Sequence, residues 1–251
     1  MSNAPHRFDD LDFEGFRRLA GDPSLSRHEK VGFPDEYREG REAAIFRDVV
    51  AKMPSLGRQG GTVLEIGPGC SDLPRMLARR CQDHAQSLVL VDSPEMLALL
   101  PDGPGISKLP GRFPEALLTP GAPSPGSVDA IVVYSVVQYV FAEGNLWQFL
   151  DAAMALLTEG GEMLLGDIPN IAMRKRFFAS AAGEESHRRY TGRDEKPVVG
   201  FNRLEPGHMD DSVVLSVLMR ARAQGFHAWV LPQAPDLPMA NRREDLLIRR
   251  P

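Results

Sequence analysis

The stretch at residues 62–74 constrains the fold of this chain more than any other. It begins with the apolar, β-branched run Thr62–Ile66, which predicts a buried strand. Gly67–Gly69 follows and allows a sharp turn, because a glycine lets backbone N–H groups approach a ligand with no Cβ in the way. Asp72 is a good N-cap, and Pro74 fits the first turn of a helix. A strand, a glycine turn and a helix in this order predict a parallel α/β sheet that binds a nucleotide group at its carboxyl edge.

A second strand and carboxylate follow. Ser87–Asp92 is a continuous apolar run that ends in an acid, and Ser93 and Pro94 then predict a helix start. Asp92 lies 25 residues after Gly67, close to the spacing of about 20 at which nucleotide-binding folds place the acid that binds ribose. A carboxylate there can accept hydrogen bonds from both ribose hydroxyls. The alternative is that Asp92 only caps its helix; with both motifs present in order, we favour ribose binding.

The glycine turn departs from two common nucleotide motifs and matches a third. A dinucleotide fingerprint needs a third glycine at position 72, which is Asp72, and no P-loop ending of Gly-Lys-Ser/Thr is present. Instead Glu65 precedes Gly67 by two residues. This E-x-G-x-G pattern resembles the first motif of class I methyltransferases that use S-adenosylmethionine. The resemblance implies that the turn packs against the amino-acid part of the cofactor and that Glu65 helps to position its ammonium group. Ser71 replaces the third glycine common in that family.

Two further segments fit the same resemblance. In that family the turn after the third strand touches adenine, often through a Gly-Asp pair; here the pair is Gly111-Arg112, so we expect backbone groups of Arg112 and Phe113 to serve. Ser135–Val140 resembles the family's fourth motif, beside the transferred methyl group. Tyr139 lies there either as a catalytic residue or as a core aromatic under the next helix. The cofactor residues that the resemblance implies are Glu65, Gly67, Pro68, Gly69, Ser71, Asp92, Ser93, Arg112, Phe113 and Ser135.

Strands and helices alternate through most of the chain. The predicted strands are Thr62–Ile66, Ser87–Asp92, Ile106–Pro110, Val128–Tyr134, Glu162–Leu165, Phe226–Leu231 and Glu244–Arg249. The predicted helices include 11–20, 39–53, 144–157 and 213–224. The pattern predicts an α/β fold: a Rossmann-like, doubly wound, mainly parallel seven-stranded sheet with an antiparallel last strand.

The chain divides into segments of different character. We expect residues 1–60 to form an N-terminal helical cap, with residues 1–10 frayed, and residues 61–251 to form the cofactor-binding methyltransferase domain. Within it, residues 171–210 are an inserted segment, and Gly183–Pro197 is too polar to form core. That stretch is either a solvated loop or a substrate lid, since loops on α/β scaffolds often become lids.

Composition argues against several partner classes. The formal net charge is −5, whereas a nucleic-acid partner usually demands a basic face. Cys70 and Cys81 fit no metal spacing, and such sparse cysteine is typical of a reducing compartment. No apolar run of 18 residues and no signal-peptide pattern is present, so we expect a cytoplasmic protein without a membrane partner. The sequence leaves the oligomeric state open, a homodimer included.

Three short runs suggest the acceptor. Glu65–Ser71, Gly166–Asn170 and Pro238–Asp245 resemble methyltransferases from bacterial surface-glycan and sugar-modification gene clusters. The resemblance implies a small acceptor such as a sugar or sugar-nucleotide hydroxyl or amine. Methylation of another small metabolite or natural product, a non-catalytic nucleotide-binding protein and a dehydrogenase are the alternatives. The missing third glycine disfavours the dehydrogenase, and the intact carboxylates disfavour the non-catalytic protein.

A methyl transfer to an oxygen or nitrogen also needs a destination for a proton. Asp167 ends the fifth predicted strand in a turn and is the first candidate base, although an Asp before such a turn commonly bonds to the turn. His187 in the inserted segment and His28 near the N-terminus are further candidates, and a lone histidine is by default a solvated surface residue. We expect metal-independent transfer, because Asp167 is the one obvious carboxylate at the fourth and fifth strand ends and a hard cation wants more oxygen ligands.

Overall fold

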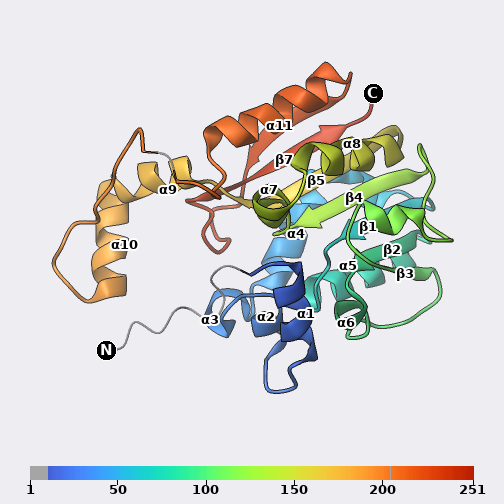
Figure 1. The fold of residues 1–251 in the computed structure, drawn as a ribbon, viewed down its shortest axis with the longest axis horizontal. Helices are drawn as coiled ribbons and strands as arrows, with labels where there is room; N and C mark the ends of the chain where they lie inside the picture. The colour runs from blue at the N-terminus through green and yellow to red at the C-terminus, as the bar shows by residue number, and fades with distance from the viewer. Residues whose placement is uncertain (1–10, 204) are drawn as a thin grey trace.

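The computed structural model describes residues 11–203 and 205–251 (Figure 1). In this part of the chain, a seven-stranded sheet has the order β3-β2-β1-β4-β5-β7-β6. Its strands are β1 (Thr62–Ile66), β2 (Ser87–Asp92), β3 (Ile106–Pro110), β4 (Val128–Tyr134), β5 (Leu157–Pro169), β6 (His227–Pro232) and β7 (Arg243–Arg249). Strand β7 runs antiparallel to both β5 and β6, and the other pairs are parallel. The predicted fold class is confirmed.

Helices cover both faces of the sheet. On one face lie α4 (Glu42–Lys52), α5 (Asp72–Asp83) and α6 (Pro94–Leu97), and on the other lie α8 (Leu146–Leu156) and α11 (Asp211–Ala223) (Figure 1). Neighbouring strand residues point to opposite faces, so that Val63 joins the core under α4 and α5 while Leu64 joins the core under α8 and α11. Burial on both faces explains why the central strands read as continuous apolar runs.

The N-terminal helices lie beside the carboxyl ends of the first strands. They are α1 (Phe13–Gly21), α2 (Arg27–Lys30) and α3 (Asp35–Arg38). The helix predicted at 39–53 is α4 alone, because Gly40 has φ +73° and separates it from α3. Helix α1 packs on α6, and an apolar cluster of Phe16, Ala20, Val31, Cys70 and Met96 joins the two. The predicted fraying at 1–10 lies outside the described residues.

The inserted segment is more ordered than the sequence predicts. Residues 183–197 were expected as a loop or lid without core, whereas the structure has α9 (Ile171–Phe178) and α10 (Ala181–Thr191), which project from the sheet (Figure 1). Ser180 caps α10 by accepting a hydrogen bond from Gly183, and Gly192, at φ +68°, ends it. End caps and i,i+3 charge pairs such as Arg188–Glu185 help to stabilise a helix that has little apolar surface to bury.

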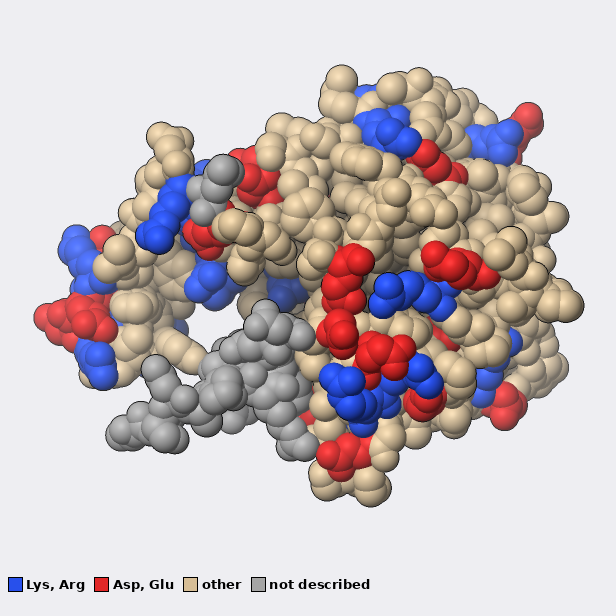
Figure 2. Space-filling view, viewed as in Figure 1, with Lys and Arg blue, Asp and Glu red and all other residues tan. Residues whose placement is uncertain are grey.

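The remaining elements are short. Helix α7 (Val137–Glu143) follows β4, and the 3₁₀ turns η1 (Pro54–Gly57) and η2 (Glu115–Leu118) precede β1 and β4. Positive and negative side chains are interspersed on the face shown in Figure 2. The part of the chain that the structure describes has no helix with the length and apolarity that crossing a membrane requires.

Candidate active site

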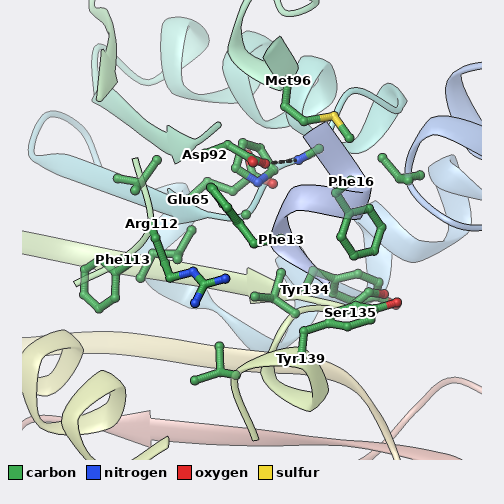
Figure 3. Close-up of a pocket in the computed structure, with 18 of the residues that line it drawn as sticks. Phe13, Phe16, Glu65, Asp92, Met96, Arg112, Phe113, Tyr134, Ser135 and Tyr139 are labelled. Atoms are coloured by element: carbon green, nitrogen blue, oxygen red, sulfur yellow. Dashed lines mark hydrogen bonds between the residues drawn. The ribbon is translucent and has the colours of Figure 1, made fainter. Parts of the chain in front are cut away.

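One pocket opens at the carboxyl ends of β1, β2 and β4, and α1 and the segment from α2 to α4 close it from the side (Figure 3). It brings together residues that the sequence analysis took from separate segments. Nine of the ten predicted cofactor residues line it: Glu65, Gly67, Pro68, Gly69, Ser71, Asp92, Arg112, Phe113 and Ser135. Ser93 lies just behind, where its hydroxyl accepts a hydrogen bond from the Met96 N–H at 3.2 Å and caps α6.

The glycine turn is tight enough to exclude side chains. Gly67 and Gly69 have φ values of +69° and +61°, a region that favours glycine. A Cβ on Gly67 would lie 2.5 Å from Val136, and a Cβ on Gly69 would lie 2.5 Å from Val31. The N-cap of α5 is Ser71, one residue before the predicted Asp72. At Gly67 and Gly69 the turn therefore presents backbone alone to the pocket.

Asp92 is anchored at the pocket wall by backbone donors. The Gly69 N–H donates to Oδ2 at 3.0 Å, and the Ser93 N–H donates to Oδ1 at 2.6 Å. Burial raises the pKa of Asp92 to about 6, and these two hydrogen bonds oppose the rise. Ser93 is the residue that caps α6. Asp92 therefore does not have the capping role that was the alternative to ribose binding. A carboxylate fixed in this way keeps lone pairs for a ligand's hydroxyl groups.

Glu65 is buried without a partner. Its side chain is 2% exposed, and Oε2 has no hydrogen bond within the described residues. Burial raises the pKa of Glu65 to about 8, and the negative charge of Asp92 adds to the rise. An unsatisfied buried carboxyl group costs about 1–3 kcal/mol or more. Its position on the pocket wall, near Asp92 in Figure 3, suits a ligand that brings a cationic donor.

At the other end of the pocket the backbone is irregular at two positions. Ser135, after β4, and Asp167, in β5, both have φ +60°, an unusual conformation outside glycine that clusters at functional sites. Ser135 lines the pocket, and its hydroxyl donates to Asp167. Arg38, from the end of α3, donates to both side chains at 2.8 Å. Gly166 leaves room for Tyr134, since a Cβ there would lie 2.5 Å from the Tyr134 ring.

The three predicted catalytic residues have different surroundings. Tyr139 lines the pocket and packs edge-on against Phe16 at 4.9 Å between ring centroids. Asp167 is 3% exposed and lies behind Arg38 and Ser135, outside the set of lining residues. His187 lies in α10, 6.4 Å from the ring of Phe178, and is also outside that set. The structure thus brings Tyr139, but neither of the other two, to the pocket.

Electrostatics assign these groups their protonation states. Although burial raises the pKa of Asp167, the guanidinium groups of Arg243 and Arg38 outweigh it and hold that pKa below its ordinary value. Burial raises the pKa of Tyr139, so its hydroxyl stays protonated at neutral pH. His28 lies 2.9 Å from a carboxylate oxygen of Asp35 and 2.5 Å from one of Glu42.

Several lining residues were not assigned to the site from the sequence. Phe13, Phe16, Phe33, Arg38 and Met96 line the pocket and are not among the predicted site residues. These side chains reach the pocket by packing between distant segments, for which the local sequence has no signal. Within the described residues, no group of three or more His, Cys, Asp and Glu side chains is placed to hold a metal ion.

Comparison with known proteins supports the fold. No family model matches the sequence. Chondramide synthase cmdD of Chondromyces crocatus is 33% identical over 115 residues, which are 44% of this chain and 3% of that protein. The chain therefore spans only about 3% of the length of the curated relative that it matches.

Solved structures match along nearly the whole chain. The N-methyltransferase NodS from Bradyrhizobium japonicum WM9, bound to S-adenosyl-L-homocysteine (SAH), has a TM-score of 0.54 at 16% identity and covers 95% of this chain and 98% of its own. The plantazolicin methyltransferase BpumL, bound to SAH and a triazolic desmethylPZN analog, has a TM-score of 0.58 at 13% identity, with 95% and 96% covered. The chain has the fold of class I S-adenosylmethionine-dependent methyltransferases.

Proposed function

We propose that this protein is an enzyme that transfers a methyl group from S-adenosylmethionine to a small-molecule acceptor. The observation that carries the proposal is the unpartnered carboxyl group of Glu65, which faces the same pocket as Asp92 and the glycine turn. These are the groups that an amino acid joined to a nucleoside would satisfy. SAH bound in solved structures of this fold supports the same cofactor.

The residues present fit that cofactor. Asp92 would accept hydrogen bonds from the ribose hydroxyls, and Glu65 would receive the ammonium group. The open backbone of Gly67–Gly69 would lie along the amino-acid part, where a Cβ has no room. Arg112 and Phe113, which line the pocket after β3, would flank the adenine. When bound, S-adenosylmethionine supplies a methyl group bonded to a positively charged sulfur, which an acceptor atom can displace in line.

Alignment is the chain's main contribution to the chemistry. Holding two reactants in a near-attack geometry can supply about 7–11 kcal/mol of the barrier. Phe16 and Tyr139 form an aromatic wall at the acceptor end of the pocket, against which an acceptor can be aligned. Tyr139, which stays protonated, donates or accepts a hydrogen bond but does not act as a base at neutral pH. Asp167 reaches the pocket only through Ser135 and Arg38, so we assign it a positioning role.

We further propose that the acceptor is a natural product or a related small metabolite. Two of the similar proteins carry natural-product names, chondramide synthase and plantazolicin methyltransferase. The expected sugar acceptor has no counterpart among these names.

We also retain residues 11–60 as a cap over the cofactor, on the basis of the contacts of Phe16 and Val31 with the glycine turn and α6. The buried free thiols of Cys70 and Cys81 support a cytoplasmic location.

Thermal melting tests the proposal at low cost. Purified protein is melted with SAH, NAD and NADP in parallel, each at the same concentration. We expect SAH alone to raise the midpoint, because a ligand that binds only the folded state stabilises it by mass action. A shift with NAD or NADP and none with SAH would favour a dehydrogenase, and no shift with any of the three would favour a protein without a nucleotide site.

A further inference from the structure

The acceptor end of the pocket presents the guanidinium group of an arginine. Arg38 lines the pocket, and its side chain is 11% exposed. Its counterion is Asp167, whose Oδ2 atom accepts from Arg38 Nη2 at 2.8 Å and from Arg243 Nη1 at 2.9 Å. The hydroxyl of Ser135 donates to the same oxygen. Two positive charges and one hydroxyl therefore share one carboxylate.

The charges behind Arg38 balance those around Asp167, because two carboxylates share one lysine there. Asp245 lies 2.7 Å from Lys52 Nζ, which also contacts Asp48 at 2.5 Å. None of these three is among the described residues that line the pocket. Glu42 does line the pocket, and His28 lies 2.5 Å from it. Arg38 and Glu42 are therefore the charged side chains that this part of the wall presents to a ligand.

The guanidinium group of Arg38 also packs against two aromatic rings. Its Cζ atom lies 4.0 Å from the centroid of Phe33 and 5.8 Å from that of Tyr134. Both of its hydrogen bonds to Ser135 and Asp167 come from Nη2, which leaves Nη1 and Nε without a hydrogen bond to the described residues. A stacked arginine with free donors matches a carboxylate, which it binds in a fork.

Flat aromatic surfaces surround this group. Phe16 and Tyr139 form an edge-on pair, and Tyr134 and Ser135 lie next to them in Figure 3. We propose that the acceptor is a planar molecule that carries a carboxylate, and that Arg38 is the residue that recognises this carboxylate. The inference deepens the proposed function and rests on it, because it assigns the acceptor to the part of the pocket left beside the cofactor.

The test uses two probes of the same shape. Salicylate carries a carboxylate beside a ring hydroxyl, and salicylamide replaces the carboxylate with a neutral amide. Each is titrated by calorimetry or ligand-observed NMR into protein saturated with SAH. We expect the wild-type protein to bind salicylate about tenfold tighter than salicylamide, a difference equal to about 1.4 kcal/mol. Equal affinity, or a preference for the amide, would overturn the proposal.

Variants then test whether Arg38 causes the preference for salicylate over salicylamide. Arg38→Met keeps an unbranched stem without the charge and should bind the two probes equally. Arg38→Lys keeps the charge but not the fork and should retain part of the preference. Arg47→Met, on the exposed side of α4 and outside the residues that line the pocket, removes the same charge and should behave as wild type. A full preference in Arg38→Met would overturn the proposal; if that variant does not fold, a full preference in Arg38→Lys has the same meaning.

The cofactor's own carboxylate is the competing source of this chemistry. SAH carries a carboxylate, whereas 5′-methylthioadenosine lacks the amino-acid part. If Arg38→Met weakened SAH binding but not that of 5′-methylthioadenosine, Arg38 would hold the cofactor and the acceptor proposal would be wrong. We expect both affinities to change by less than about threefold, below 1 kcal/mol. Failure of the wild-type protein to bind SAH would instead refute the proposed function, so the two failures are distinct.

Discussion

Replacing Glu65 with glutamine is the sharpest test of the pocket's electrostatics. The folded-state pKa of Glu65 is about 8, against an ordinary value of 4.5. Because the folded-state pKa is raised, the unfolded chain loses its proton first, and the folded state loses stability as the pH rises from 4.5 towards 8. Each pH unit in this window costs about 1.4 kcal/mol. Glu65 therefore costs the ligand-free protein about 3 kcal/mol more at pH 8 than at pH 5.

Glu65→Gln keeps the shape of the side chain and removes its ionisation. We expect the free energy of unfolding of the variant, relative to wild type, to increase by about 3 kcal/mol between pH 5 and pH 8. Urea unfolding followed by circular dichroism, without ligand, measures it at each pH. Glu162→Gln is a matched control. Burial raises the pKa of Glu162, but Arg249 and Ser55 lower it below the ordinary value of 4.5, so Glu162 is ionised in both states above that pH. The stability difference between this variant and wild type should therefore stay nearly constant between pH 5 and pH 8.

The same substitution should weaken the binding of the cofactor. SAH affinity should fall by about 10–100-fold in Glu65→Gln at neutral pH, since a charge-assisted hydrogen bond contributes about 1.5–3 kcal/mol. A stability difference between variant and wild type that stays constant within about 0.5 kcal/mol from pH 5 to pH 8 would refute the reasoning. Glu65 would then have a partner that holds it in one protonation state.

Four further predictions concern the remaining site. Asp92→Ala should abolish measurable SAH binding in calorimetry while the fold stays intact by circular dichroism, since two charge-assisted hydrogen bonds are worth about 2–4 kcal/mol. Gly69→Val should also prevent SAH binding, because its side chain meets Val31; normal affinity would contradict the turn's role. Asp167→Asn should lower the free energy of unfolding by about 3 kcal/mol, because two arginines lose their buried counterion; unchanged stability with kcat lowered by about 10²–10⁴ would instead identify a base. Methyl transfer should survive EDTA, and loss restored by magnesium or manganese would show metal dependence.

Most strands of the sheet could be predicted because short stretches of sequence determine them. The runs Thr62–Ile66 and Ser87–Asp92 are buried on both faces, so their apolar sequence reports burial directly. Glu65 and Asp92 could be assigned to one pocket because parallel strands end at the same edge of a sheet. The short distances along the chain between each strand, its turn and its helix fix these positions without knowledge of the rest.

The acceptor end could not be predicted in the same way. Arg38 and Arg243 lie more than 200 residues apart in sequence, and both converge on Asp167. The sequence placed Asp167 at a strand end, but its φ of +60° and its two arginines depend on tertiary packing. Helix α10 was missed for a different reason, because its caps and charge pairs stabilise it without an apolar periodicity.

A crystal structure of the protein with SAH tests the central claim most directly. The account predicts ribose hydroxyl groups within hydrogen-bonding distance, about 3 Å, of the Asp92 carboxylate, and the SAH ammonium group at the now satisfied Oε2 of Glu65. It also predicts that Arg38 remains on Ser135 and Asp167, with open space beside Tyr139 for an acceptor. SAH bound elsewhere, or bound in this pocket with its ribose away from Asp92 and its ammonium group away from Glu65, would contradict the account.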